Sequence, residues 1–462
     1  MHATCSPVRG QQKRIQERIL DSDIYSFFKV LTSKDLLEHV EQHLPDHRER
    51  QFPPTETLAM FLSQAFSADR SCQRIVNEAA TNRLVGGLRP CSTATGGYCR
   101  ARQRLPLDMV RGLARITGRL IDDQVPLQWR WRGRAVRLID GSTVTLPDTT
   151  ANQSAFPQQE RQKEGLGFPI CRFVGITCLS SGAVLDAAMS RYQGKGSDEQ
   201  SLLRSLLHTL DREDIVLGDA FYCTYFLLAE LQRRGIDGVF EQHGGRKRRT
   251  DFRTGQRLGP CDHLVTYTKP KRQPDWMSDD AYASAPDSIT VRELKAGGKV
   301  LVTTFCCPRD VPRHVVKDLY KSRWHVELDL RFIKTTLGME TLSCKTPEMA
   351  TKEFWVYLLA YNLIRLLMAQ SALLADCLPR TLSFKHTTQL WMCFRSQAMP
   401  GYTDEQVVLL LRLIAQRRVG KRPGRIEPRA VKRRPKPMPL LTEPRELARA
   451  RVERYGYPAR LK

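Results

Sequence analysis

The chain has no paired-cysteine motif, although 13 of its 462 residues are cysteines. Their number is odd and they are scattered without a Cys-x-x-Cys pair, which argues against a disulfide framework and favours reduced thiols over a zinc site. Neither a Gly-x-Ser-x-Gly elbow nor a Walker A loop occurs, so serine hydrolases and P-loop enzymes lack support. The first residues are polar and charged, and we therefore expect no signal peptide.

A long uninterrupted apolar run is also missing. Residues 355–374 are the one candidate for a membrane span, and Asn362, Arg365 and Gln370 interrupt them. A charge at the centre of a membrane-spanning helix is costly. The segment therefore predicts a buried amphipathic helix, and we expect no membrane partner.

Acidic residues are few relative to basic ones. The sequence contains 49 Asp and Glu against 73 Lys and Arg, which gives a formal net charge of +24. This balance indicates a polyanionic partner, with nucleic acid ranked ahead of an anionic membrane surface. Residues 244–249 and 432–436 concentrate the basic charge. We expect a cytoplasmic protein that binds nucleic acid.

Helical patterns dominate the first 130 residues. Segments 55–66 and 71–80 predict a helix pair, in which Asp69 or Ser71 caps the second helix. A basic helix is expected to begin at Gly96. The arrangement fits a helix-turn-helix DNA reader and a plain helical bundle with a basic surface equally well, because the spacing does not separate them.

Strand-like patterns begin at residue 134, and their succession predicts a mixed sheet with flanking helices. The expected elements are strands 135–146, 170–179 and 183–191, helix 197–210 with Ser197 as its cap and Glu199 in its first turn, strand 215–219 and helix 222–234. Residues 240–311 are rich in Gly, Pro and basic residues and indicate an inserted β-rich unit with strands at 264–268, 288–294 and 300–306. Further helices are expected at 350–375, 383–395 and 403–417, before a mobile basic tail.

One helical segment combines charged and aromatic residues on a single face. At about 100° per residue, Tyr320, Arg323 and Lys334 lie within roughly 40° of Glu327 if residues 320–334 form one α-helix. Apolar residues form the neighbouring stripe: Leu319, Val326, Leu330, Ile333 and Leu337. Such a helix packs into a core on one face and presents charge on the other. A solvated, salt-bridged surface is the ordinary alternative.

Two further acids follow apolar runs that predict strands. Asp140 follows residues 136–139 and Asp219 follows residues 215–218, and either alone is an ordinary turn-forming aspartate. In neighbouring strands their carboxylates would repel unless a cation lay between them. Hard oxygen ligands suit Mg²⁺ or Mn²⁺, and Glu327 would add a third carboxylate.

Three acids around one or two divalent ions suit phosphodiester chemistry. In that interpretation Arg323 grips a phosphate bidentately and Lys334 acts as a point charge. The Tyr320 hydroxyl would hydrogen-bond an oxygen of the DNA backbone.

These residues resemble the transposases of the insertion-sequence-four family, which carry a DDE carboxylate triad. The resemblance is carried by the order Asp140, Asp219, Glu327 and by the spacing Y-(2)-R-(3)-E-(6)-K that begins at Tyr320. The motif DGSTV beginning at Asp140, the motif GDAFY at residues 218–222 and the loop at 147–169 match as well. The similarity covers about residues 55–374. The four-residue signature is specific because all its spacings must agree, whereas neither aspartate motif is specific alone.

The resemblance implies an α/β protein with a ribonuclease-H-like mixed sheet, a β-rich insertion between the second Asp and the Glu, and helical N- and C-terminal regions. The expected units are a helical DNA-end-binding region at 1–130, the first part of the catalytic core at 131–239, the insertion at 240–311, the second part of the core with the Glu327 helix at 312–376, and a helical C-terminal region with a basic tail at 377–462.

The implied reaction is Mg²⁺-dependent (or Mn²⁺-dependent) nicking of double-stranded DNA at the terminal inverted repeats of an element. The freed 3′-hydroxyl then attacks target DNA, often through a hairpin intermediate. The resemblance also implies a synaptic homodimer in which each protomer holds one element end. Such a protein is cytoplasmic in a bacterium and associates with the nucleoid when bound to DNA.

Family members also place a tryptophan of the insertion against a flipped base. Trp276 is the only tryptophan between Asp219 and the signature helix, so stacking logic makes it the candidate. Its surroundings do not clearly match the family's placement, and a packing role is equally open. Two other functions stay open: a metal-dependent nuclease without strand transfer, and a catalytically silent DNA-binding protein derived from a transposase. The complete set of acids argues against the silent protein.

Overall fold

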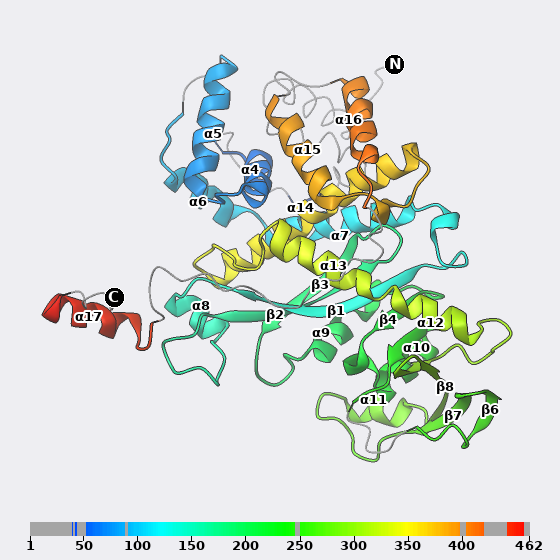
Figure 1. The fold of residues 1–462 in the computed structure, drawn as a ribbon. Helices are drawn as coiled ribbons and strands as arrows, with labels where there is room; N and C mark the ends of the chain where they lie inside the picture. Colours follow the sequence, from blue (N-terminus) through cyan, green and yellow to red (C-terminus); the bar gives the residue numbers. More distant parts are fainter. Residues whose placement is uncertain are drawn as a thin grey trace, which may run out of the picture.

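The computed structural model describes residues 39, 42–43, 52–87, 91–244, 250–397, 403–419 and 441–456. The basic residues 245–249 and 432–436, and most of the expected tail, lie outside the described residues. Figure 1 shows one twisted sheet with helices on both of its faces. Most of the expected strands and helices are present, and their bounds differ from the expected ones by a few residues.

The sheet has nine strands in the order β3-β2-β1-β4-β5-β9-β8-β7-β6. The strands are β1 (Val136–Thr145), β2 (Ile170–Cys178), β3 (Val184–Arg191), β4 (Ile215–Gly218), β5 (Asp237–Glu241), β6 (Gln256–Gly259), β7 (Asp262–Thr268), β8 (Ser288–Ala296) and β9 (Lys299–Thr303). β1, β2 and β3 are antiparallel neighbours, whereas β4 and β5 run parallel to β1. This half of the sheet has the ribonuclease-H-like order 3-2-1-4-5, which confirms the expected fold class.

The strands expected in residues 240–311 join this same sheet. β9 pairs antiparallel with β5 through Val239 and Thr303, and β8, β7 and β6 continue outward in antiparallel succession. The short helix α11 (Asp279–Ser284) lies between β7 and β8. The β-rich segment is therefore a continuation of the core sheet, held to it by backbone hydrogen bonds.

Alternating side chains of the strands supply two cores, one on each face of the sheet. On β1, Leu138 belongs to the larger core and Ile139 to the smaller one, as the period of two requires. The smaller core is covered by α9 (Glu199–Leu206) and α10 (Tyr225–Arg233), which cross over between parallel strands. Short 3₁₀ turns follow α9 and β4: η3 (Leu207–Thr209) and η4 (Ala220–Tyr222).

The larger core surrounds α14 (Pro347–Leu374), which packs along α7 (Leu107–Asp123). Among the described residues α14 is the one helix long and apolar enough to cross a membrane, and 89% of its apolar window is buried inside the protein. The Asn362 side chain donates hydrogen bonds to the carbonyls of Ala114 and Val184, at 2.9 and 2.8 Å. Asn362, one of the polar residues that interrupt the apolar run, thus ties α14 to α7 and to β3.

Most of the remaining helices surround the same core, whereas the last of them has no buried residue and extends away from it (Figure 1). They are α4 (Pro54–Phe66), α5 (Cys72–Val85), α6 (Gly96–Arg104), η2 (Leu127–Trp129), α8 (Thr150–Ala155), η6 (Pro379–Thr381), α15 (Phe384–Gln397), α16 (Asp404–Gln416) and α17 (Arg445–Tyr455). The Ser71 hydroxyl caps α5 by accepting a hydrogen bond from the Arg74 amide. Ser71 was one of the two caps expected for this helix. The expected cap Ser197 is wrong, because Asp198 accepts from the Ser201 amide and α9 begins at Glu199.

The signature segment is not the single α-helix that its spacing predicts. It consists of α12 (Arg313–Lys321), α13 (Trp324–Arg331) and a π-helical turn, η5 (Phe332–Thr336). Between the two α-helices, the amides of Arg323 and Val326 donate to carbonyls three residues earlier, which tightens the chain. In η5 the Leu337 amide donates to the Phe332 carbonyl five residues earlier, which widens it.

Candidate active site

Asp140 and Asp219 occupy matching positions on neighbouring parallel strands. The register of β1 and β4 pairs Leu138 with Leu217, and each aspartate lies two residues further on. Parallel neighbours are about 4.8 Å apart, so the two carboxylates emerge side by side where β4 ends. β1 does not end at Asp140, contrary to the apolar-run interpretation, because it pairs with β2 as far as Thr145.

The Asp140 carboxyl group is mostly buried, with 17% of its side chain exposed. Its pKa is raised to about 7, chiefly by burial and in addition by the nearby charges of Asp219 and Glu199. A hydrogen bond from the Gly141 amide, at 2.9 Å, and the charge of Arg323 act in the opposite direction. Asp140 therefore lies within electrostatic reach of two other carboxylates and one guanidinium.

Glu327 comes to this site from α13, which contacts β1. The Arg323 guanidinium donates to Glu327 Oε1 at 2.8 Å, and its other terminal nitrogen lies 3.9 Å from Asp140 Oδ2. One guanidinium therefore links the helix acid to the strand acid. Tyr320 is half-buried beside them, and burial raises the pKa of its hydroxyl, while Arg323 lowers it and Asp219 raises it.

Lys334 lies on the same side of β1. Its Nζ donates to Ser142 Oγ at 3.1 Å, two residues beyond Asp140 and therefore on the same strand face. The chain after η5 fixes this position, since the Glu340 amide donates to the Lys334 carbonyl and the Thr145 amide donates to Glu340. The structure thus brings Tyr320, Arg323, Glu327 and Lys334 close to β1 or β4, through three distinct helical turns instead of one regular stripe.

Trp276 lies apart from this group, in the segment before α11. The Arg204 guanidinium lies 3.8 Å from the centre of its ring, and Phe226 meets the ring edge-on at 6.0 Å. The ring is 45% exposed and lines a cavity of about 520 Å³ between α9, α10 and α11. Gln200, the neighbour of Glu199, lines the same cavity.

A further acid lies near these residues, although the sequence analysis placed it only in the first turn of a helix. The Glu199 carboxylate accepts a hydrogen bond from the Tyr222 hydroxyl at 3.1 Å and lies 3.9 Å from Arg172 Nε. Burial raises the pKa of Glu199 most, and the Asp219 charge adds to it, while Tyr222 and Arg172 lower it. The one sequence signal was Gly141, because a glycine beside Asp140 leaves room for another group.

The donor chemistry fits a divalent cation. Asp140, Asp219 and Glu327 offer hard carboxylate oxygens, the ligands that Mg²⁺ and Mn²⁺ prefer. In the part of the chain that the structure describes, no three His, Cys, Asp or Glu side chains are already grouped as a metal site. Arg323 pairs with Glu327 at 2.8 Å and lies 3.9 Å from Asp140 Oδ2.

A buried ion cluster orients the helix that carries Glu327. Asp329 is fully buried, and its carboxylate pairs with Arg365 of α14 at 2.5 Å and with Arg380 at 2.8 Å. Asp329 and Glu327 lie on different sides of α13, since two residues span about 200°. Anchoring Asp329 therefore directs Glu327 toward β1.

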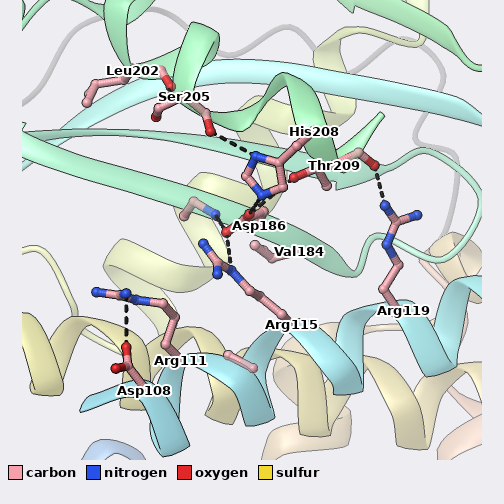
Figure 2. A network of polar contacts seen from close by, with 12 residues as sticks. Asp108, Arg111, Arg115, Arg119, Val184, Asp186, Leu202, Ser205, His208 and Thr209 are labelled. Atoms are coloured by element: carbon pink, nitrogen blue, oxygen red, sulfur yellow. Dashed lines mark hydrogen bonds and ion pairs between the residues drawn. The ribbon is translucent and has the colours of Figure 1, made fainter. Parts of the chain in front are cut away.

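A second cluster orients α9. Figure 2 shows Asp186 of β3 between Arg115 of α7 and the turn that follows α9. Asp186 is 2% exposed and accepts from Arg115 Nε at 2.7 Å and from the Thr209 hydroxyl at 3.1 Å, with His208 Nε2 3.4 Å away. Arg119 pairs with Asp211 at 2.8 Å just beyond. These contacts fix the C-terminal end of α9 on the sheet.

Comparison with known proteins shows similarity to one kind of enzyme. The family described as "Transposase DDE domain" matches residues 131–363. The chain is 29% identical over 401 residues to "Transposase InsG for insertion sequence element IS4" of Escherichia coli strain K12, covering 84% of this chain and 87% of that protein. It is 33% identical over 76 residues to "Transposase for insertion sequence element IS421" of Escherichia coli, covering 16% and 20% respectively.

Among solved structures, a piggyBac transposase synaptic complex with hairpin DNA is similar to this chain with a TM-score of 0.43 and 10% identity. The similarity covers 87% of each chain.

Proposed function

Because this chain belongs to the family of transposases with a DDE domain, we propose that its acidic site nicks the ends of an insertion element and joins the freed 3′-hydroxyl groups to target DNA. The protein is a DNA transposase and therefore an enzyme that cleaves DNA and transfers strands. The observation that carries the assignment of the site is the convergence of Asp140, Asp219 and Glu327. They come from β1, the end of β4 and α13.

We assign the three acids as ligands of divalent cations, with Mg²⁺ as the ion and Mn²⁺ as its substitute. Transposases of this family use a divalent metal, and an all-carboxylate donor set suits these two ions. When bound, the cations stabilise charge on the phosphoryl oxygens and activate the attacking water or 3′-hydroxyl. The protein's own part is to hold its acids on two neighbouring strands and on a braced helix.

Arg323 is assigned to the DNA phosphate. In the structure it neutralises Glu327 and faces Asp140. If these acids held cations, the guanidinium would be free to hold a phosphate with two parallel hydrogen bonds. Lys334, beside Ser142, supplies a point charge, and the half-buried Tyr320 supplies a hydroxyl donor.

The proposed partners are the terminal inverted repeats and target DNA, held by a homodimer in the synaptic complex. A formal charge of +24 supports binding to a polyanion. We keep Trp276 as the candidate that receives an unstacked base, supported by its exposed ring and the adjoining cavity. The proposed compartment is the bacterial cytoplasm, on the nucleoid when DNA is bound.

The proposed division of labour follows the expected units. Residues 1–130 bind element ends, 131–239 and 312–376 form the catalytic core, 240–311 form the insertion and 377–462 the C-terminal region. The position of the β-rich segment, between β5 and the helix α12 that precedes Glu327, supports an insertion into the core.

A single reaction separates this function from its alternatives. The full chain is incubated with Mg²⁺ and a labelled duplex that carries the element's terminal inverted repeat, together with a plasmid target. Nicked duplex plus joined product supports the transposase. Nicking without joined product would mean that the protein is a nuclease. A gel shift without cutting would mean that it is a DNA-binding protein without catalytic activity.

A further inference from the structure

We propose that Glu199 is a fourth carboxylate of the metal site, binding a divalent cation together with Asp140 and Asp219. The proposal rests on the proposed function, since it extends the same acidic site. It assigns a metal ligand to α9, a helix outside the three elements that carry the DDE acids. The argument starts from the space above Gly141.

Gly141 leaves room for the Glu199 carboxylate. A Cβ atom at Gly141 would lie 2.3 Å from Glu199 Cδ and 2.6 Å from both of its carboxylate oxygens. These are far inside van der Waals contact, so any side chain at position 141 would displace the acid. The carboxylate therefore rests on the backbone of β1 directly after Asp140.

Glu199 is also tied to the turn that carries Asp219. The buried Tyr222 hydroxyl donates to Glu199 Oε2 at 3.1 Å, and Tyr222 ends the 3₁₀ turn for which Asp219 is the cap. The neighbouring Gln200 side chain donates to the Phe221 carbonyl at 2.6 Å. Two contacts thus hold the start of α9 against the Asp219 turn.

The two flanking helices approach the strand acids from opposite faces of the sheet. Glu327 comes from α13 on the face of the larger core, and Glu199 comes from α9 on the face of the smaller core. Figure 1 shows α13 and α9 on either side of β1. Asp140 on β1 and Asp219 directly after β4 belong to the sheet that separates these two helices.

On the α9 side Glu199 forms a long ion pair with Arg172. Arg323 compensates Glu327 on the other face. Arg172 is 3.9 Å from Glu199, beyond hydrogen-bond distance, and its guanidinium lies over the Tyr192 ring while it donates to the Ser197 carbonyl. Carboxylates this close are stable together when a cation lies among them. A first-turn glutamate is also favourable to a helix by itself, and the test must separate that role from metal binding.

The test measures Mn²⁺ binding to the DNA-free full chain by titration calorimetry, with free Mn²⁺ followed by electron paramagnetic resonance. Glu199→Gln keeps the size of the side chain and its acceptor for Tyr222 but removes the charge. We expect its Mn²⁺ affinity to fall about ten- to a hundredfold, the range found for groups that support a metal site. Gly141→Ala keeps the charge and displaces the carboxylate, so it should lower the affinity as well.

Matched variants complete the experiment. Glu446→Gln changes an exposed first-turn glutamate of α17 and should leave Mn²⁺ affinity unchanged. Without metal, Glu199→Gln should melt at or above the wild-type temperature, because a repelling charge is gone; a clear fall would assign Glu199 to helix stability and overturn the proposal. Mn²⁺ affinity within twofold of wild type in both Glu199→Gln and Gly141→Ala would overturn it too.

The result is independent of the proposed reaction. If Mn²⁺ affinity falls in the variants while the wild type fails to cut DNA, Glu199 is still a metal ligand and the proposed function is wrong. If the wild type nicks and joins DNA while Glu199→Gln binds Mn²⁺ normally, the function stands and the assignment of Glu199 fails.

Discussion

Asp140 has a pKa of about 7 in the folded, metal-free chain, against an ordinary value of 3.8. Below pH 4 this carboxyl group is neutral in both the folded and the unfolded chain. Between pH 4 and 7 the unfolded chain loses this proton while the folded chain keeps it. The free energy of unfolding therefore falls as pH rises, and the contribution of the protonated group is fully lost above pH 7. The fold therefore tolerates the charged Asp140 at a free-energy cost that a bound cation offsets.

The raised pKa of Asp140 predicts a pH-dependent difference in stability. In the presence of a chelator at pH 8, Asp140→Asn should be more stable than the wild type by about 1–3 kcal/mol, since one pKa unit corresponds to about 1.4 kcal/mol. The difference should shrink as pH falls to 5, because wild-type Asp140 is then protonated. Urea unfolding at both pH values measures it. Equal differences at pH 8 and pH 5 would contradict the buried, charge-repelled carboxyl group.

Removal of any one DDE acid should stop the chemistry. Asp140→Asn, Asp219→Asn and Glu327→Gln should each lower the nicking rate by about 10³-fold or more, since a metal ion supplies several kcal/mol of transition-state stabilisation. Single-turnover nicking of a labelled element end measures the rate, and a gel shift checks that DNA is still bound. Asp318→Asn, an exposed acid on α12, is the matched control. A variant that nicks at the wild-type rate would remove that acid from the site.

At the scale of single elements, the signature segment shows where sequence reasoning succeeds and where it stops. The two aspartates could be predicted beside each other because short apolar runs identify strands and parallel neighbours bring their ends together. The stripe on one regular helix was wrong, because neither the tight turn at Ser322–Arg323 nor the π turn at Phe332–Thr336 carries a Pro or Gly. Both depend on tertiary contacts, such as Lys334 with Ser142.

Glu199 illustrates the same limit. Its place in a helix start could be read from the sequence, whereas its contact with Gly141 joins residues 58 positions apart and depends on how α9 crosses the sheet. The pairing of β5 with β9 is equally non-local, so the sequence predicted the strands of the insertion without showing that they extend the core sheet.

The buried ion cluster on α13 yields a prediction at this scale. Asp329→Asn should destabilise the protein by about 3–5 kcal/mol, because it leaves the buried guanidinium groups of Arg365 and Arg380 without a counter-charge. Thermal and urea unfolding measure the loss. Asp318→Asn, which removes an exposed ion pair from the neighbouring helix, should leave the melting temperature unchanged. Similar melting temperatures for both variants would mean that the cluster does not brace α13.

For the whole molecule, the excess of positive charge dominates the interaction with DNA. Six to ten phosphate contacts would lower the affinity about 10³- to 10⁵-fold between 50 and 200 mM salt, because each contact releases condensed counterions. Fluorescence anisotropy with a labelled duplex over this range measures the slope of log affinity against log salt. Melting curves at each salt concentration show that the protein stays folded. A flat slope would contradict binding through the phosphate backbone.

The continuous sheet also limits how this transposase can move. From β3 to β6 each strand is hydrogen-bonded to the next, and β9 joins the insertion directly to β5, beside the strand that ends at Asp219. The insertion is therefore attached to the core by backbone hydrogen bonds between strands as well as by the connecting chain. DNA bound at the far edge of the sheet would lie at a fixed distance from the active site. That distance would determine which phosphate is cut.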